Sequence, residues 1–312
     1  MTLNASYKKT RLNFRALYPP ICLLLAIFML FFSRSIKNGV AEGLTFSFTT
    51  IVPTLFPFFI LSDLWAALFV LKADGRLSRL FESFFHINGT GIVAFLSGAV
   101  CGFPVGVKMA SELYKANKIS KDEYERLSGF VNNPSAAFII SGVGLGMIGD
   151  IKAGIFLYIS ILLSAVTVGI LFRPKRRNIL YSKDISRQSF SLVNSVKNAA
   201  FTSISIAAYI SFFSGLISVI KELLPSEPLL LIIFSFLEVS NSTKLIASST
   251  SLDYLSKLVL TAFSLGFSGF SVHIQAMSFF DGISSKKYLF MKLVQGLFSI
   301  LYIFIFALLF LQ

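Results

Sequence analysis

Polar side chains inside otherwise apolar stretches are the residues of this chain that could do chemistry. The chain has 312 residues, of which 55% are hydrophobic and 14% charged. A polar or ionisable group at the centre of a bilayer is costly unless it is paired or hydrated, so each such residue is a functional candidate. The candidate binding residues are Lys108, Asn132, Asn133, Ser135, Glu238, Asn241, Lys244, His273 and Gln275.

Two short polar stretches concentrate these groups. In Asn132-Asn133-Pro134-Ser135, the proline prevents helix continuity within an apolar block. We take residues 238–244 as its counterpart, with one acid, one base and several hydrogen-bonding groups in seven residues. Backbone freed at such places can bind a solute, because helix N-termini attract anions and free carbonyls coordinate cations.

Several candidates also have a purely structural interpretation. Lys108 has Glu112 four positions on and lies near a helix end, so it could pair or extend its ammonium to the interface. His273 and Gln275 could donate to a solute or only bridge helices. Asp63 follows two prolines in a kinked helix and could simply end that helix near the interface.

Glycine and proline interrupt the apolar blocks at places that we interpret as hinges: Gly102, Pro104, Gly106, Pro134 and Gly269. Unwound backbone in a membrane is tolerated only where protein or a water-filled cavity surrounds it. Residues 101–105 resemble residues 268–272, and 119–121 parallel 283–286. This similarity between the two halves indicates an internal duplication. In many transporters, paired interrupted segments mark the binding site.

The elements that carry these residues are apolar stretches long enough to cross a bilayer, which takes about 20 residues for a core of roughly 30 Å. We predict an all-α, polytopic transmembrane helical bundle of about 8 to 9 hydrophobic segments, with re-entrant or broken helices and an internal repeat of two halves. The segments are 18–32, 44–71, 91–110, 127–149, 153–172, 199–220, 229–248, 258–280 and 288–311.

The distribution of charge divides the chain and orients it. Residues 1–40 form a basic arm and the first transmembrane helix, 41–172 a first half, 173–197 a basic linker and 198–312 a second half. The positive-inside rule predicts that the arm and the linker are both cytoplasmic. Five crossings before the linker would place it outside, so we predict that 91–110 is a re-entrant hairpin that returns to the cytoplasmic side.

Two further helical patterns and one processing question complete the prediction. Residues 77–85 show apolar residues at helical spacing, which indicates an amphipathic helix on the membrane surface. Ser120 followed by Glu123 is a capping-box pattern. The basic start and the short apolar run 18–32 resemble a signal peptide, but no small-residue cleavage site follows, so we expect a retained helix.

Other classes of function are disfavoured. The net charge of +13 is explained by cytoplasmic loops, so we expect no nucleic-acid partner. With Cys22 and Cys101 as the only cysteines, we expect neither a metal site nor a cofactor. The short Gly266-Phe267-Ser268-Gly269 is a weak match to intramembrane serine proteases, and no metalloprotease or Walker A motif occurs, so we do not expect an enzyme.

Several ordered motifs resemble the sporulation integral membrane protein family usually called YlbJ, whose members contain nucleoside-recognition (Gate) regions. The resemblance spans most of the chain and is carried by residues 53–58, 97–98, 102–108, 112–114, 119–121, 132–133, 142–144, 238–241 and 269–275. Two departures concern the contacts with substrate: Pro134 follows the paired asparagines directly where the family commonly has Gly-Pro, and the Glu238 stretch lacks the usual next glycine.

The resemblance implies a role in endospore formation, moving dipicolinic acid into the forespore across its outer membrane. It also implies that both halves are Gate-like and resemble parts of concentrative nucleoside transporters. We therefore expect a multi-pass cell-membrane carrier, secondary or facilitative, for a small carboxylated aromatic anion. A nucleoside or nucleobase carrier and a non-transporting membrane scaffold in spore assembly are the alternatives. Both a coupling ion and an oligomer are compatible with the sequence.

Overall fold

The computed structural model describes residues 18–69, 75–175, 191–224 and 226–310, and these residues contain helices and no strand. Five stretches are long and apolar enough to cross a membrane: Ser33–Leu61, Ile151–Leu171, Leu192–Leu223, Tyr254–Met277 and Ser285–Phe310. Three shorter apolar helices are α5 (Gly91–Cys101), η4 (Phe138–Ile148) and α10 (Glu227–Leu237). The predicted all-α membrane architecture is confirmed for the described residues.

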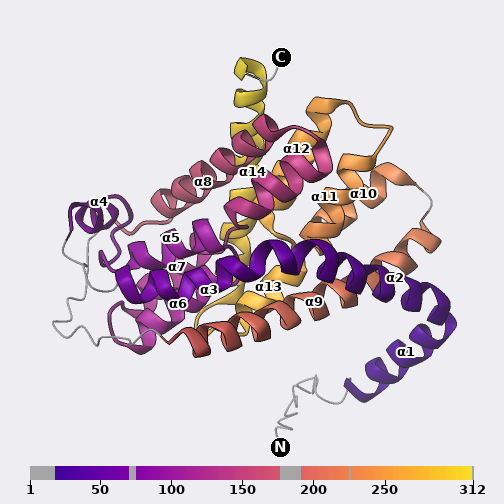
Figure 1. The fold of residues 1–312 in the computed structure, drawn as a ribbon, viewed down its shortest axis with the longest axis horizontal. Helices are drawn as coiled ribbons and strands as arrows, with labels where there is room; N and C mark the ends of the chain where they lie inside the picture. Colours follow the sequence, from indigo (N-terminus) through magenta and orange to yellow (C-terminus); the bar gives the residue numbers. More distant parts are fainter. Residues whose placement is uncertain (1–17, 70–74, 176–190, 225, 311–312) are drawn as a thin grey trace, which may run out of the picture.

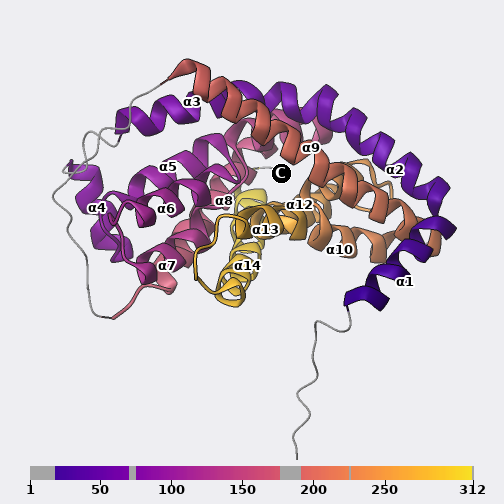
Figure 2. The ribbon, with the colours of Figure 1, turned by 90° about the horizontal axis from the view of Figure 1, so that it is seen from below.

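The first long helix follows α1 (Tyr18–Phe31) and consists of α2 (Ser33–Phe46), the π-helical η2 (Ser47–Ile51) and α3 (Val52–Phe69). It begins well before the apolar segment predicted from residue 44, so the boundary placed at residue 40 falls inside α2. In Figures 1 and 2, α2 lies beside α9 (Leu192–Leu223). Gly39 and Gly43 face serines of α9, and the missing side chains let the two backbones approach closely.

The segment 91–110 forms two helices rather than one. α5 ends at Cys101 and α6 (Val105–Lys115) begins after Gly102, whose φ of +85° is a conformation that favours glycine. The two helices pack against each other, as a hairpin requires (Figure 2). Gly106 lies within α6 and not at the hinge itself, and its role is to allow close packing.

The next segment is also broken. α7 (Lys121–Val131) begins with the predicted capping box, in which the Ser120 hydroxyl accepts from the Glu123 amide at 3.3 Å and the Ser120 amide donates to the Glu123 carboxylate at 2.7 Å. The chain unwinds at residues 132–135, continues as η4 and then as α8 (Ile151–Leu171). The amphipathic α4 (Arg76–Phe85) is confirmed as a helix and buries Phe81 and Phe85.

The second half begins earlier than predicted, because α9 starts at Leu192 and Lys197 lies in that helix. Residues 176–190 of the predicted linker lie outside the described part of the chain. α10 and α11 (Val239–Ser248) are broken at Glu238. α12 (Tyr254–Phe267) and α13 (Gly269–Met277) are broken at Ser268, which has a φ of +78°.

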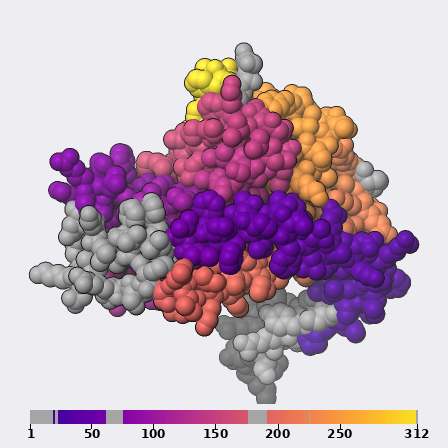
Figure 3. All heavy atoms as spheres, viewed as in Figure 1, coloured from indigo at the N-terminus to yellow at the C-terminus, as the bar shows by residue number. Residues whose placement is uncertain are grey.

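The last helix, α14 (Ser285–Phe310), stands upright in Figure 1 and packs against α7, α8 and α12. In the space-filling view of Figure 3, α2 and α3 form a band across one face, with η4 and α8 above it and α9 below it. The buried apolar core continues behind this band, where residues from α3, η4, α8 and α12 form one hydrophobic cluster. The broken segments therefore lie inside the protein, as unwound backbone requires.

Candidate functional site

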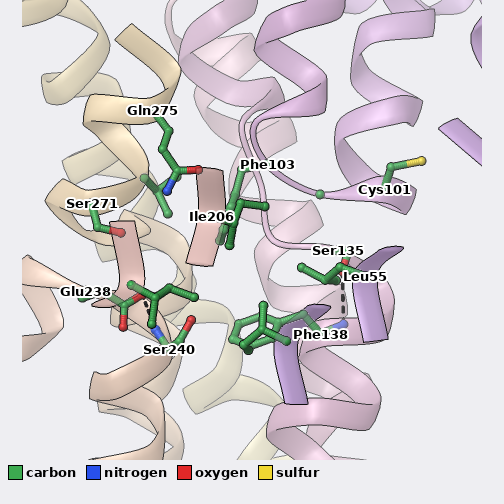
Figure 4. A pocket seen from close by; sticks show the side chains of 14 residues that line it. Leu55, Cys101, Phe103, Ser135, Phe138, Ile206, Glu238, Ser240, Ser271 and Gln275 are labelled. Carbon is green, nitrogen blue, oxygen red and sulfur yellow. Dashed lines mark hydrogen bonds between the residues drawn. The ribbon is translucent and has the colours of Figure 1, made fainter. Parts of the chain in front are cut away.

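One cavity joins three of the helix breaks, at residues 102–104, 132–135 and 238, and reaches α13 at Ser271, just after the break at 268 (Figure 4). It is lined by Ile51, Leu55, Cys101, Gly102, Phe103, Ser135, Phe138, Ile206, Ile210, Glu238, Ser240, Ser271, Val272 and Gln275. Its free volume is about 20 Å³. That space holds about one water molecule, so a larger solute needs the walls to move.

The two walls of this cavity differ in chemistry. Glu238, Ser240, Ser271 and Gln275 lie on the side formed by α11 and α13 (Figure 4). The opposite side presents apolar side chains from α3, the first break and η4: Leu55, Phe103 and Phe138. A polar wall facing an aromatic wall suits a small solute that has a flat apolar body and polar edges.

Helix N-termini face the cavity. At the start of α11, the buried Glu238 carboxylate accepts hydrogen bonds from the amides of Ser240 at 3.0 Å and Asn241 at 2.6 Å. At the start of η4, the Ser135 hydroxyl accepts from the Phe138 amide at 3.1 Å. No side chain caps α13. The buried Ser271 hydroxyl in its first turn has no hydrogen-bond partner within the described ranges. Helix N-termini carry partial positive charge and favour anions. The α11 terminus already holds the Glu238 carboxylate, so the uncapped start of α13 is the one that offers amides to another anion.

A buried polar network lies beside the cavity, on the other side of the unwound residues 132–135. It consists of Asn132, Asn133, His273, Tyr288, Lys292 and Gln295, all of them fully buried. The Asn132 amide donates to the Tyr288 hydroxyl at 2.7 Å, and that hydroxyl lies 3.1 Å from Nδ1 of His273. Two atoms of the network, Oδ1 of Asn132 and Nε2 of His273, have no hydrogen-bond partner among the described residues.

The network explains the placement of the predicted residues. Asn132 and Asn133 hold the unwound segment and do not line the cavity, whereas Ser135 does. On α13, Ser271 and Gln275 face the cavity, and His273 points to the network from the opposite side. α13 therefore contributes side chains both to the cavity and to the network.

Sequence reasoning missed three members of the network. Tyr288, Lys292 and Gln295 recur on α14 at positions i, i+4 and i+7, which places them on one helix face. The Lys292 ammonium donates to the Asn132 carbonyl and to Oε1 of Gln295, both at 2.8 Å, and Gln295 donates to Oδ1 of Asn133 at 2.7 Å. A lysine inside the apolar segment 288–311 was the signal that could have identified this face.

Lys244 lies in a second, larger hollow and not in the central cavity. This hollow has a volume of about 560 Å³ and is lined by Phe46, Thr50, Thr54, Ser141, Gly142, Gly146, Met147, Lys244, Ala247 and Ser248. The Lys244 ammonium is 3.1 Å from the Glu42 carboxylate and lies over the ring of Phe46. The same elements, η2 with α3, η4 and α11, line both spaces, so the hollow lies further along the same walls.

The remaining predicted residues lie elsewhere. Lys108 is half-buried on α6 and does not line the cavity. Asn241 donates to the Ser214 hydroxyl at 2.8 Å and so connects α11 to α9. The side chain of Asp63 lies outside the described residues. Within the described ranges, no three His, Cys, Asp or Glu side chains gather as the ligands of a metal ion would.

Comparison with known proteins gives one relative. The chain is 26% identical to the sporulation integral membrane protein YlbJ of Bacillus subtilis (strain 168) over 333 aligned residues, which cover 90% of this chain and 81% of the relative. No protein-family model matches the chain, and no solved structure matches it significantly. The similarity supports membership in the YlbJ family, and with the apolar helices it supports a multi-pass membrane protein.

Proposed function

We propose that this member of the YlbJ family is a carrier, secondary or facilitative, for a small carboxylated aromatic solute, with dipicolinic acid during endospore formation as its substrate. The observation that carries the proposal is the cavity where three helix breaks and the first turn of α13 meet. Helix N-termini face it, and a buried serine hydroxyl is free to donate into it. A carboxylate is the partner that this arrangement favours.

The shape of the cavity supports a carrier that changes conformation. The present space holds about one water molecule, so an aromatic dicarboxylate can bind only after the walls separate. The breaks at residues 102–104, 132–135, 238 and 268 are the places where short helix segments can swing without bending a continuous helix. In each half, a long helix precedes two broken helix pairs and a further long helix, an order that pairs the break at 102–104 with the break at 238 and not with residues 268–272, as the sequence similarity would.

The larger hollow gives the solute a route. Its single lysine attracts an anion, and its hydroxyl groups can hydrogen-bond a carboxylate in transit. An arriving carboxylate can replace Glu42 on Lys244, since both partners of that ion pair are largely exposed. From there the solute moves along α11 toward Ser240 and the cavity. In the proposed orientation, the N-terminus and the linker are cytoplasmic, and the membrane is the outer forespore membrane.

A nucleoside or nucleobase carrier is the second candidate, and one observation favours it. Among the described residues that line the cavity, none is a lysine or arginine, and Glu238 is an acid. Together with Gln275 and the serines, it offers the hydrogen-bond donors and acceptors that a neutral base needs. A neutral solute would therefore meet no charge repulsion from Glu238.

The test is uptake of labelled dipicolinate and labelled uridine into proteoliposomes that contain the purified protein. We expect dipicolinate uptake by the wild type and a fall of about 10- to 100-fold in Ser271→Ala, the effect of losing a hydrogen bond to a charged group. Ser205→Ala is the matched control, because that exposed hydroxyl bonds only to the Phe201 carbonyl of its own helix. The control should transport like the wild type.

The outcomes separate the candidates. Uptake of uridine but not of dipicolinate would contradict the anion carrier and support the nucleoside carrier. Uptake of neither solute, under several imposed ion gradients, would favour the membrane scaffold. Equal dipicolinate uptake by Ser271→Ala and Ser205→Ala would remove the cavity from the proposal.

A further inference from the structure

Lys292 is the one lysine among the described residues that is fully buried. It lies within α14, a helix long and apolar enough to cross the membrane. Its ammonium contacts two neutral oxygens, the backbone carbonyl of Asn132 and the side-chain amide oxygen of Gln295. No carboxylate lies within ion-pair distance of it in the described ranges. The protein thus holds this lysine side chain here without a carboxylate partner.

The position of this ammonium is that of a cation site. Asn132 follows the last residue of α7, so its carbonyl is at the negative end of a helix. Carbonyls at unwound segments and at the C-terminal ends of half-helices are the groups that coordinate a coupling cation in transporters with broken helices. An amide oxygen is a further neutral ligand of the same kind. These ligands are already occupied by a side chain of the protein.

The other members of the network fix this arrangement. Gln295 accepts from Lys292 and donates to Oδ1 of Asn133, so the same amide serves both the lysine and the unwound segment. Tyr288 holds the Asn132 amide from one turn earlier on α14. The three α14 side chains therefore form a cradle in which the ammonium neutralises the freed end of α7.

We propose that Lys292 is a built-in cation that takes the place of an inorganic coupling ion at the unwound segment, so that the protein works without sodium or another metal cation. The uptake measurement that tests this inference rests on the proposed carrier function, whereas the stability measurement does not. It assigns Lys292 a positioning role: the ammonium keeps residues 132–135 unwound and in register with the cavity at Ser135.

The first measurement is thermal unfolding of the purified protein in detergent, in choline, sodium, potassium and methylammonium chloride at equal ionic strength. The wild type should unfold at the same temperature in all four salts. Lys292→Ala leaves the oxygen ligands vacant, and we expect it to unfold at least about 4 °C lower in choline chloride. Methylammonium, which reproduces the lost group, should restore part of that loss.

Lys257→Ala is the matched control. Its ammonium also donates to a backbone carbonyl, that of Ala247 at 3.0 Å, but it is only half-buried and lies away from the unwound segment. Methylammonium should not raise the unfolding temperature of this variant selectively. A selective rescue of Lys292→Ala is a result that loss of packing alone would not produce.

The second measurement is dipicolinate uptake by the wild type in the same salts. We expect a change of less than about twofold when choline replaces sodium, whereas sodium coupling would change uptake by more than about tenfold, equivalent to about 1.4 kcal/mol. Sodium-dependent uptake, or an unfolding temperature of the wild type raised by sodium alone, would overturn the inference. So would a Lys292→Ala protein that is as stable as the wild type, or one that no cation restores.

The two proposals can fail separately. If the wild type takes up no solute, the carrier function fails while the unfolding temperatures still test the cation site. If Lys292→Ala cannot be recovered from membranes, the wild type alone decides, because a specific effect of sodium on its unfolding temperature contradicts the inference and equal temperatures in all four salts support it.

Discussion

Removing one hydroxyl from the buried network tests whether that network stabilises the fold. Tyr288→Phe deletes the group that accepts from the Asn132 amide at 2.7 Å and lies 3.1 Å from Nδ1 of His273. Both partners are fully buried, and each already has one other polar atom without a partner among the described residues. An unsatisfied buried polar group costs about 1 to 3 kcal/mol, so two of them give about 2 to 6 kcal/mol.

The comparison variant is Tyr158→Phe. Its hydroxyl makes one hydrogen bond, to the Ala99 carbonyl at 3.2 Å, and its side chain is only half-buried. We expect a loss of about 1 kcal/mol for this variant. At roughly 2 °C per kcal/mol, the unfolding temperature should fall by about 4 to 12 °C for Tyr288→Phe and by about 2 °C for Tyr158→Phe.

Thermal unfolding in detergent, followed by circular dichroism, measures both variants under identical conditions. The tyrosine ring is kept as a phenylalanine in each case, so the packing of the ring is nearly unchanged and the hydroxyl alone is compared. If Tyr288→Phe unfolds no lower than Tyr158→Phe, the network does not stabilise the fold, and the placement of its hydrogen bonds is wrong.

Two further predictions concern the helix ends. In Gly98→Ala, the added methyl would collide with the Val131 carbonyl, so we expect the free energy of unfolding to fall by about 1 to 3 kcal/mol. The control, Gly142→Ala, should change it little, because its methyl meets only ordinary contacts. Equal unfolding temperatures of the two variants would contradict this. At the start of α8, the hydrogen bond from the Tyr254 hydroxyl holds the pKa of Asp150 below its ordinary value of about 3.9. This bond therefore stabilises the fold above about pH 4 and is lost as the pH falls through the lowered pKa. The unfolding temperatures of wild type and Tyr254→Phe should differ at pH 7 and approach each other as the pH falls below the ordinary pKa of Asp150; a constant difference would contradict it.

The positions of the breaks could be predicted because they depend on local chemistry. Pro134 cannot continue a helix, and Gly102 and Gly269 adopt positive φ angles that other residues rarely take. The same reasoning placed the start of α7, since the capping box depends only on Ser120 and Glu123. In each case the residues that decide the structure are close together in the sequence.

The ends of the long helices were harder to predict, for a physical reason. α2 begins at Ser33 with polar residues that an apolar segment excludes, and its Gly39 and Gly43 pack closely against α9. α9 likewise begins at Leu192, within the predicted linker. Contacts between segments far apart in the sequence decide these ends, and a pattern of hydrophobicity does not contain them.

The candidate site was predicted in part. Ser135, Glu238 and Gln275 line the central cavity, as a broken-helix site suggested. Lys108 and Lys244 were candidates because they are charged residues within apolar stretches, and the structure places both outside that cavity. Charge identifies which residue types can bind an anion, but the face of a helix on which they lie depends on its packing.

In the proposed carrier, the arrangement around residues 132–135 would form an anion site without a lysine in its walls. On one side of this unwound segment, the C-terminal end of α7 is neutralised by the buried ammonium of Lys292. On the other side, η4 begins at the cavity with its positive end toward that space. The negative end of one half-helix is therefore screened while the positive end of the next stays open. A carboxylate held by helix ends and hydroxyls is bound less tightly than one in a buried ion pair, and a carrier must release its solute as well as bind it. In the proposed carrier, this balance would place the Lys292 ammonium behind the site and keep it out of direct contact with the anion.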